Sequence, residues 1–172
     1  MRKLALMLVL FSPIMWAKEE ANSVRELVER LAHPIFPRTA DVMAIIRIES
    51  EFNPLAVNGK NKGLMQVLHG SFDPCENIAQ GVQLLHEYYR ILRDPHAAVM
   101  AYNSGIGRYL DGVRSEQYLA KFQKLRRKYD THAQPVGADK DHASSPDHPA
   151  HKKGGGAPSP VLCRLQEGRE EG

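Results

Sequence analysis

The chain has 172 residues, of which 25% are charged, and a formal net charge of +3. So mild a positive balance argues against a nucleic-acid-binding protein, in which a strongly basic stripe is expected. The length allows one domain of about a hundred residues, which can bury enough surface to fold without a metal or a disulfide, and further segments at both ends.

Residues 1–17 have the three-part layout of a secretory signal peptide. Arg2 and Lys3 give a positive start, residues 4–11 are almost wholly apolar, and Ala17 precedes a charged stretch. The apolar run is too short to cross a bilayer. We therefore expect a signal peptide over 1–17 and export to the periplasm. An uncleaved anchor or a buried N-terminal helix is the alternative.

The middle of the chain is typical of helices that begin at capping residues. Such starts lie at the Ser23 to Glu26 capping box, at Thr39, at Asp73-Pro74, at Asp94-Pro95 and at Ser115. Apolar residues then recur three and four positions apart, at 24, 27, 28 and 31, at 42, 45 and 46, at 78, 82, 85, 89 and 92, and at 118, 122 and 125. No alternating run predicts a strand, so the predicted fold class is all-α, over a domain of residues 22–130.

Composition changes sharply near Asp130. Residues 131–172 are rich in His, Pro, Gly, Ser and Ala and poor in large apolar side chains. Such a segment cannot bury enough surface to offset its ordering entropy, so we predict a disordered C-terminal tail. The two cysteines are Cys75 in the domain and Cys163 in the tail. Export permits a disulfide between them, and two unpaired thiols without a role are the alternative.

Glu49 follows the apolar positions 42, 45 and 46 on one helical face. A carboxyl group at an inward position loses hydration, which raises its pKa and suits it to act as a general acid near neutral pH. Glu49 is therefore a candidate catalytic residue. A glutamate that leans out to solvent at the helix end is the alternative on spacing alone.

Four segments in order carry a resemblance to a known family. They are Ile48 to Val57, with Glu49 followed by Ser50; Gly63-Leu64-Met65-Gln66-Val67; Asn77-Ile78 with Gly81; and Ala101-Tyr102-Asn103-Ser104-Gly105. The set resembles the soluble lytic transglycosylases of the lysozyme superfamily, with Glu49 at the position of the catalytic acid. The resemblance covers residues 24 to 129 and implies a goose-type lysozyme-like helical domain with a substrate cleft.

The resemblance also implies an activity on peptidoglycan. Family members cut the bond between N-acetylmuramic acid and N-acetylglucosamine and release a 1,6-anhydro sugar, and a single carboxyl group acts first as acid and then as base. Two alternatives remain: a hydrolytic muramidase of the same fold, and a non-catalytic glycan-binding assembly scaffold. The candidate second carboxylates, Asp73, Asp94 and Asp111, are explained by capping and by a turn, which favours the single-acid scheme.

Five further residues match family positions. Tyr102 matches a tyrosine whose hydroxyl lies near the acid and can hydrogen-bond it, with core packing as the alternative. Met65 and Gln66 match residues that line the sugar cleft, although Met65 also suits the core. Ser50 orients the acid or the acetamido group, or else closes the helix by a hydrogen bond. Asn103 binds sugar or caps a helix end.

The remaining expectations are broader. Asn77 and Ile78 are expected to be structural, and Gly105 and Gly107 to supply turn conformations. Only ten residues separate Gln66 from Asn77, a shorter link than in many relatives, which predicts a more open cleft.

The basic residues crowding the last helix, from Lys121 to Lys128, are read as a solvated face, with binding to anionic wall or membrane as the sharper alternative. No metal or organic cofactor is expected. The expected partners are glycan strands and a cell-envelope secretion, conjugation or pilus machinery. We expect a monomer that opens the wall locally for this machinery. General wall turnover and phage-encoded lysis are the rival roles.

Overall fold

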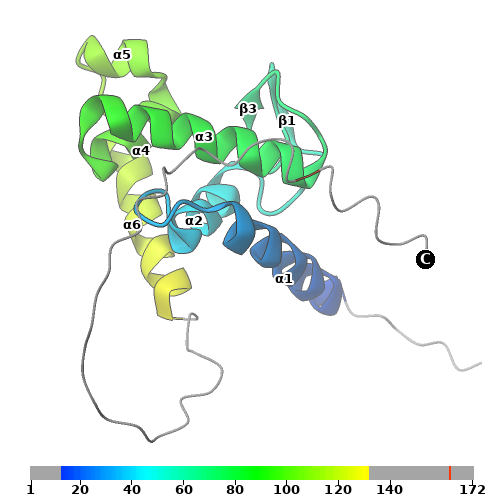
Figure 1. The fold of residues 1–172 in the computed structure, drawn as a ribbon. Helices are drawn as coiled ribbons and strands as arrows, with labels where there is room; N and C mark the ends of the chain where they lie inside the picture. Colours follow the sequence, from blue (N-terminus) through cyan, green and yellow to red (C-terminus); the bar gives the residue numbers. More distant parts are fainter. Residues whose placement is uncertain (1–12, 132–162, 164–172) are drawn as a thin grey trace, which may run out of the picture.

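A computed structural model describes residues 13–131 and Cys163 (Figure 1). In chain order, the described part contains α1 (Pro13–Leu31), α2 (Thr39–Glu49), β1 (Val57–Asn58), β2 (Asn61–Lys62), β3 (Val67–Leu68), α3 (Pro74–Leu92), α4 (Pro95–Ser104), α5 (Ile106–Leu110) and α6 (Glu116–Thr131). The helical fold class is confirmed. The disorder predicted for the tail concerns residues outside the described part, apart from Thr131 and Cys163, and stays a prediction.

The sequence analysis missed a small antiparallel sheet of order β1-β2-β3, in which Lys62 pairs with both Val57 and Val67. Each strand has two residues, too few to show an alternating pattern. In Figure 1 the sheet lies at the N-terminal end of α3, while α4 and α5 lie toward its other end.

Helix α2 forms the centre of the core. Val42, Ile45 and Ile46 are fully buried, as their spacing predicts, but so are their neighbours Met43 and Ala44. Residues 40–46 of the helix are all buried, and α1 and α6 both pack against it. This packing anchors the helix whose last residue is Glu49.

The other predicted apolar faces are confirmed. Their buried residues are Val24, Val28 and Leu31 in α1, Ile78, Val82 and Leu85 in α3, and Phe122 in α6. Because α3 packs against both α1 and α4, these faces join the side chains of α2 in one hydrophobic core.

Two of the predicted helix starts are confirmed in detail. The carboxylate of Asp73 accepts a hydrogen bond from the Glu76 N–H at 2.8 Å, and that of Asp94 accepts one from the His96 N–H at 2.8 Å. Each acidic cap is followed by proline at the first helical position, where the missing N–H has no cost. Both aspartates are thus explained by capping.

Two other helix starts were predicted wrongly. Helix α1 begins at Pro13, since proline is tolerated in a first turn, so Ser23 lies inside the helix rather than at its cap. Thr39 is the first helical residue of α2, and the cap position belongs to Arg38, whose N–H donates to the Asp41 carboxylate at 2.9 Å. No helix in the described part is both long enough and apolar enough to traverse a membrane.

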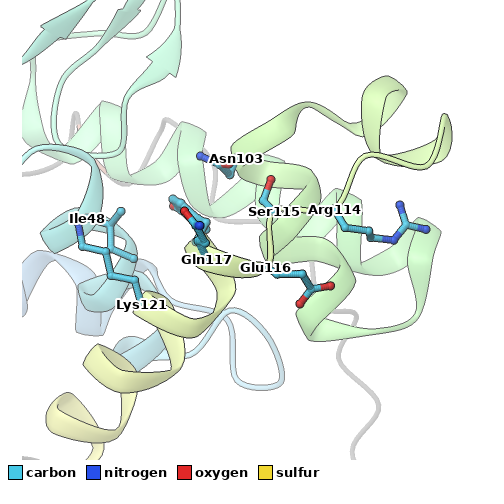
Figure 2. A pocket seen from close by; sticks show the side chains of 8 residues that line it. Ile48, Asn103, Arg114, Ser115, Glu116, Gln117 and Lys121 are labelled. Atoms are coloured by element: carbon cyan, nitrogen blue, oxygen red, sulfur yellow. The ribbon is translucent and has the colours of Figure 1, made fainter.

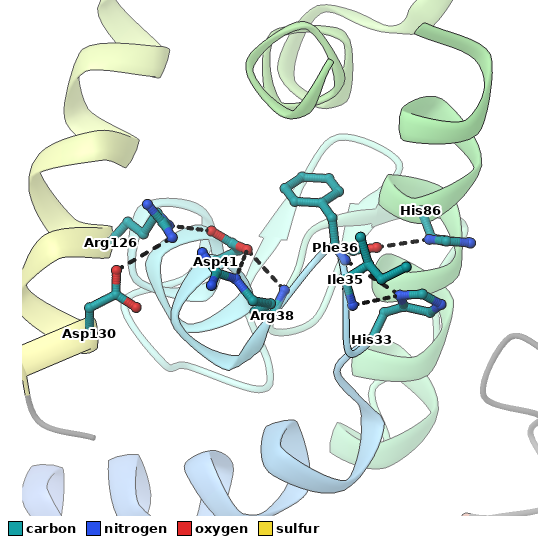
Figure 3. Close-up of polar contacts among 8 residues, drawn as sticks. All are labelled: His33, Ile35, Phe36, Arg38, Asp41, His86, Arg126 and Asp130. Carbon is teal, nitrogen blue, oxygen red and sulfur yellow. Dashed lines mark hydrogen bonds and ion pairs between the residues drawn. The ribbon is translucent and has the colours of Figure 1, made fainter. Parts of the chain in front are cut away.

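The start of α2 is tied to α6 by an ion pair. Arg126 Nε donates to Asp41 Oδ1 at 2.7 Å, and Arg126 Nη2 lies 3.5 Å from Asp130 (Figure 3). The Asp41 side chain is only 4% exposed, so its charge needs this partner. The expectation that the basic residues of the last helix form a solvated face is therefore wrong for Arg126.

The tail and the domain are linked by a disulfide between Cys75 and Cys163, whose Cα atoms are 5.7 Å apart. The sequence left this pairing open. Cys75 lies in the first turn of α3, and both cysteines pack against the core. The bond joins residues 88 positions apart and so closes a loop that contains α3 to α6.

Removing this bond should destabilise the protein, because the unfolded chain would regain the entropy of an open loop. We expect Cys163→Ser to lower the free energy of unfolding by about 2–4 kcal/mol in urea denaturation. Cys75→Ser and the double variant should lose the same amount, since one bond is removed in all three. Additive losses in the double variant would contradict the pairing.

Candidate active site

Glu49 is the last residue of α2 and is only partly exposed. Burial raises the pKa of its carboxyl group above the usual value, while the hydrogen bond from Tyr118 and the positive charge of Lys121 partly oppose the rise. The C-terminal end of a helix also disfavours a negative charge. The structure thus gives Glu49 the sheltered environment that its spacing predicts for a general acid.

Tyr118 holds the carboxyl group from α6. Its hydroxyl donates to Glu49 Oε1 at 2.5 Å. Burial and the neighbouring charge of Glu49 raise the pKa of Tyr118 well above its ordinary value, so the phenol keeps its proton. The sequence placed Tyr118 only on an apolar helical face, and its role was missed because 69 positions separate the two residues.

Tyr102 lies near the acid but bonds elsewhere. Its hydroxyl donates to the carbonyl oxygen of Met65 at 2.7 Å. Burial raises the pKa of Tyr102, and so does the charge of Glu49, which places the ring close to that carboxyl group. The hydrogen bond to the acid that the resemblance implies for Tyr102 is made instead by Tyr118.

Met65 and Gln66 belong to the framework of the loop that carries the sheet. Met65 is fully buried, which fits the core reading and not a cleft floor. The side-chain Nε2 of Gln66 donates to the carbonyl oxygens of Ala56 at 3.0 Å and Gly63 at 2.9 Å. That amide nitrogen is used to close the loop, so the structure does not offer it to a sugar.

Asn77 clamps the same loop onto α3 and is structural, as expected. Its Oδ1 accepts from the Met65 N–H at 2.8 Å, and its Nδ2 donates to the carbonyl oxygens of Lys62 at 2.9 Å and Ser71 at 2.8 Å. Gly81 lets the loop approach α3 closely, because a Cβ atom there would lie 2.5 Å from Met65 Sδ.

The glycines after α4 were predicted to supply turn conformations. Gly105 has a φ of +82°, which favours glycine. Gly107 lies inside α5 and is not among the residues of positive φ, so that prediction is wrong for Gly107.

The structure gives Ser50 and Asn103 different roles. The hydroxyl of Ser50 donates to the Ile46 carbonyl oxygen at 3.1 Å, which is the helix-terminal alternative. Asn103, at the end of α4, is exposed and lines a pocket. Of the predicted binding residues, Asn103 is the one that the structure places at an open cavity.

This pocket has a volume of about 630 Å³, and Figure 2 shows the side chains that line it. Its lining comes from the ends of α2 and α4, from the segment before α6 and from the first turns of α6: Ile48, Asn103, Arg114, Ser115, Glu116, Gln117, Tyr118 and Lys121. Glu49 adjoins the lining through its chain neighbour Ile48 and its hydrogen-bond partner Tyr118. The lining includes amide and hydroxyl groups, which suit a sugar, beside three charged side chains.

Sequence reasoning missed most of this lining. Exposed polar residues at the start of a helix, such as Gln117 and Lys121, look like an ordinary solvated face until α2 and α4 are placed against them. Among the candidate second carboxylates, Asp111 is exposed in a turn beside Gly112. Glu116 is the carboxylate that lines the pocket, and it was not predicted. No group of three potential metal-binding side chains is found in the described ranges.

The comparison with protein families agrees with this geometry. The family described as Transglycosylase SLT domain matches residues 38–125, half of the chain. The match runs from the cap position of α2 to α6 and so includes Glu49, the clamped loop, Tyr102 and Tyr118. No curated protein and no solved structure gives a significant match.

The chain therefore belongs to the transglycosylase SLT domain family. Its domain is of the lytic transglycosylase type, the type that acts on peptidoglycan.

The raised pKa of Glu49 has a consequence for stability. A carboxyl group with a folded-state pKa above its unfolded value adds stability that is complete at low pH and lost as pH rises through the folded pKa. Glu49→Gln should therefore raise the melting temperature at pH 7, by an amount equivalent to about 0.5–2 kcal/mol. The gain should shrink below about pH 4. A gain that grows with acidity would contradict this assignment.

The hydrogen bond from Tyr118 should be visible in the titration of Glu49. Because the bond favours the ionised carboxylate, Tyr118→Phe should raise the pKa of Glu49 further, as measured from the pH dependence of its side-chain ¹³C shift. Tyr109→Phe in α5 is the matched control and should leave that pKa in place. A pKa that is unchanged or lower in the Tyr118 variant would rule out the contact in solution.

Proposed function

We propose that the protein cleaves the β-1,4 bond between N-acetylmuramic acid and N-acetylglucosamine in peptidoglycan, with formation of 1,6-anhydro-N-acetylmuramic acid. The observation that carries this proposal is the sheltered carboxyl group of Glu49, held by Tyr118 at 2.5 Å beside a polar pocket in a domain of this family. The reaction needs no second catalytic carboxyl group, because one carboxyl group can donate and then accept a proton.

In the first step, protonated Glu49 donates its proton to the glycosidic oxygen as that oxygen leaves the anomeric carbon. The 2-acetamido oxygen of the substrate stabilises the positive charge that develops on this carbon. In the second step, ionised Glu49 takes the proton of the 6-hydroxyl group, whose oxygen bonds to the anomeric carbon. The carboxyl group ends protonated, as it began, and no water is consumed.

Tyr118 fits both states of this cycle. It donates to Oε1, so the acid proton belongs on Oε2, which is free to face the leaving oxygen. When that proton has gone, the same hydrogen bond stabilises the carboxylate. Lys121, whose charge lowers the pKa of Glu49, also favours the ionised state between the steps. The two residues oppose the pKa rise that burial causes.

The pocket supplies groups for the sugar. Asn103, Gln117 and Ser115 offer amide and hydroxyl groups suited to sugar hydroxyls and acetamido groups, and Ile48 offers an apolar surface. Hydrolysis is the alternative reaction, in which ionised Glu49 or the lining carboxylate of Glu116 would activate water. The family match supports the transglycosylase reaction.

The cellular role rests on the sequence. The signal-peptide pattern of residues 1–17 supports export to the periplasm, and a single small domain suits local opening of the wall for a secretion, conjugation or pilus machinery. We propose that the protein acts there as a monomer on glycan strands.

Replacing the acid should abolish the reaction. We expect Glu49→Gln to lower the release of soluble fragments from purified peptidoglycan at least about a hundredfold, because general acid catalysis is lost. Glu51→Gln, two residues away and exposed, is the control and should retain activity. Release that survives the Glu49 substitution would contradict the role of Glu49 as the acid, and no release by the unaltered protein would indicate a glycan-binding scaffold.

Mass spectrometry of the products identifies the reaction. The 1,6-anhydro ends expected here are about 18 mass units lighter than the reducing ends left by hydrolysis. Products that carry only the heavier ends would identify a muramidase.

A further inference from the structure

A second pocket lies at the other end of α2. It has a volume of about 180 Å³ and is built by the loop before α2, the start of α4 and the middle of α6. Helix α2 has 11 residues and is therefore about 16 Å long. Arg38 and Asp41 at its start belong to this pocket, whereas Ile48 at its end belongs to the pocket beside Glu49.

The floor of the second pocket is apolar. Phe36 and Phe122 are buried beneath it, and Ile35 and Pro95 form exposed parts of its wall. The side chain of Ile35 is 67% exposed, so a ligand can reach it. An apolar cavity of about 150 Å³ is large enough to bind benzene, so this pocket has room for one large apolar side chain.

The charges that a ligand can reach at its rim are positive. The side chains of Arg38 and Arg126 are 55% and 30% exposed, whereas that of Asp41 is 4% exposed and already accepts from both residues. Arg126 is also paired with Asp130. Arg38 is held less firmly, with its Nε 4.0 Å from Asp41, so its guanidinium can turn to a carboxylate.

The wall that carries Ile35 is preorganised. His33 Nδ1 accepts from the Ile35 N–H at 3.1 Å and the Phe36 N–H at 3.4 Å, and His86 Nδ1 donates to the Phe36 carbonyl oxygen at 2.8 Å (Figure 3). The two imidazole rings stack with centroids 4.1 Å apart. The loop therefore does not need to be ordered when a ligand binds, which lowers the entropic cost of binding.

We propose that this pocket is a docking site for a segment of a partner protein that presents one large apolar side chain next to a carboxylate. The side chain would enter between Ile35 and Phe122, and the carboxylate would pair with Arg38. A glycan strand is a poorer fit, because the floor is aromatic and aliphatic and the rim lacks side-chain amides. A partner bound here would leave the pocket beside Glu49 open.

The probe for this site is N-acetyl-L-phenylalanine, which combines one ring with one carboxylate. We expect its addition to the ¹⁵N-labelled protein to give saturable amide shifts at Phe36, His96 and Arg126, with a dissociation constant of about 1 mM. Gln117 and Lys121, at the other pocket, should not shift. The neutral N-acetyl-L-phenylalaninamide should bind at least about fivefold more weakly, because a charge-assisted contact is lost.

Two variants with matched controls test the assignment. Ile35→Ser and Arg38→Ala replace exposed side chains and should each weaken binding of the probe at least about fivefold. Ile91→Ser, at a residue 55% exposed on α3, and Arg108→Ala on α5 should bind normally. The spectrum outside the pocket reports whether each variant is folded.

Non-saturable shifts, shifts centred on Gln117, or normal binding by both test variants would overturn the proposal. Equal affinity for the acid and its amide would overturn the carboxylate contact. The readout is independent of glycan cleavage, so it can succeed or fail whatever the reaction at Glu49.

Discussion

The candidate active site depends on the hydrogen bond between Tyr118 and Glu49. That bond depends in turn on how α2 and α6 pack. Helix α2 is buried over residues 40–46, so its last residue emerges at a fixed place beside α6. The ion pair of Asp41 with Arg126 joins the same two helices near the start of α2. These two contacts fix α2 against α6. The carboxyl group of Glu49 can therefore be partly buried and still reach the pocket.

Several residues that carry the family resemblance hold the framework of the domain together. Asn77 holds the loop to α3, Tyr102 holds it to α4 through the Met65 carbonyl, and Gln66 closes it internally. Gly81 permits the close approach. In these contacts, polar groups are buried together with their hydrogen-bond partners. Removing one partner would leave the other unsatisfied and would lower the stability of the fold by about 1–3 kcal/mol. The residues that carry the family resemblance therefore stabilise the packing of the domain that holds Glu49.

Opposing influences set the pKa of Glu49. Burial raises the pKa of Glu49, while Tyr118 and Lys121, one helical turn apart on α6, lower it. The proposed reaction, in which Glu49 gives up a proton and then takes one back, would need both influences, because either alone would favour one protonation state too strongly. Such a site is maintained at some expense of stability, since the ionised carboxylate is less well solvated than it would be in water.

The sequence by itself determined most of the helices, their apolar faces, the two aspartate caps and the place of Glu49 after the apolar face of α2, because each depends on residues within one or two turns of one another. Only the tertiary structure decided that Tyr118 meets Glu49, that Arg126 pairs with the buried Asp41, that Cys75 pairs with Cys163, and that Gln117 and Lys121 face a pocket. Those contacts join positions tens of residues apart, and no local pattern specifies them. The two-residue strands also escaped the sequence, because they exist only through pairing with one another.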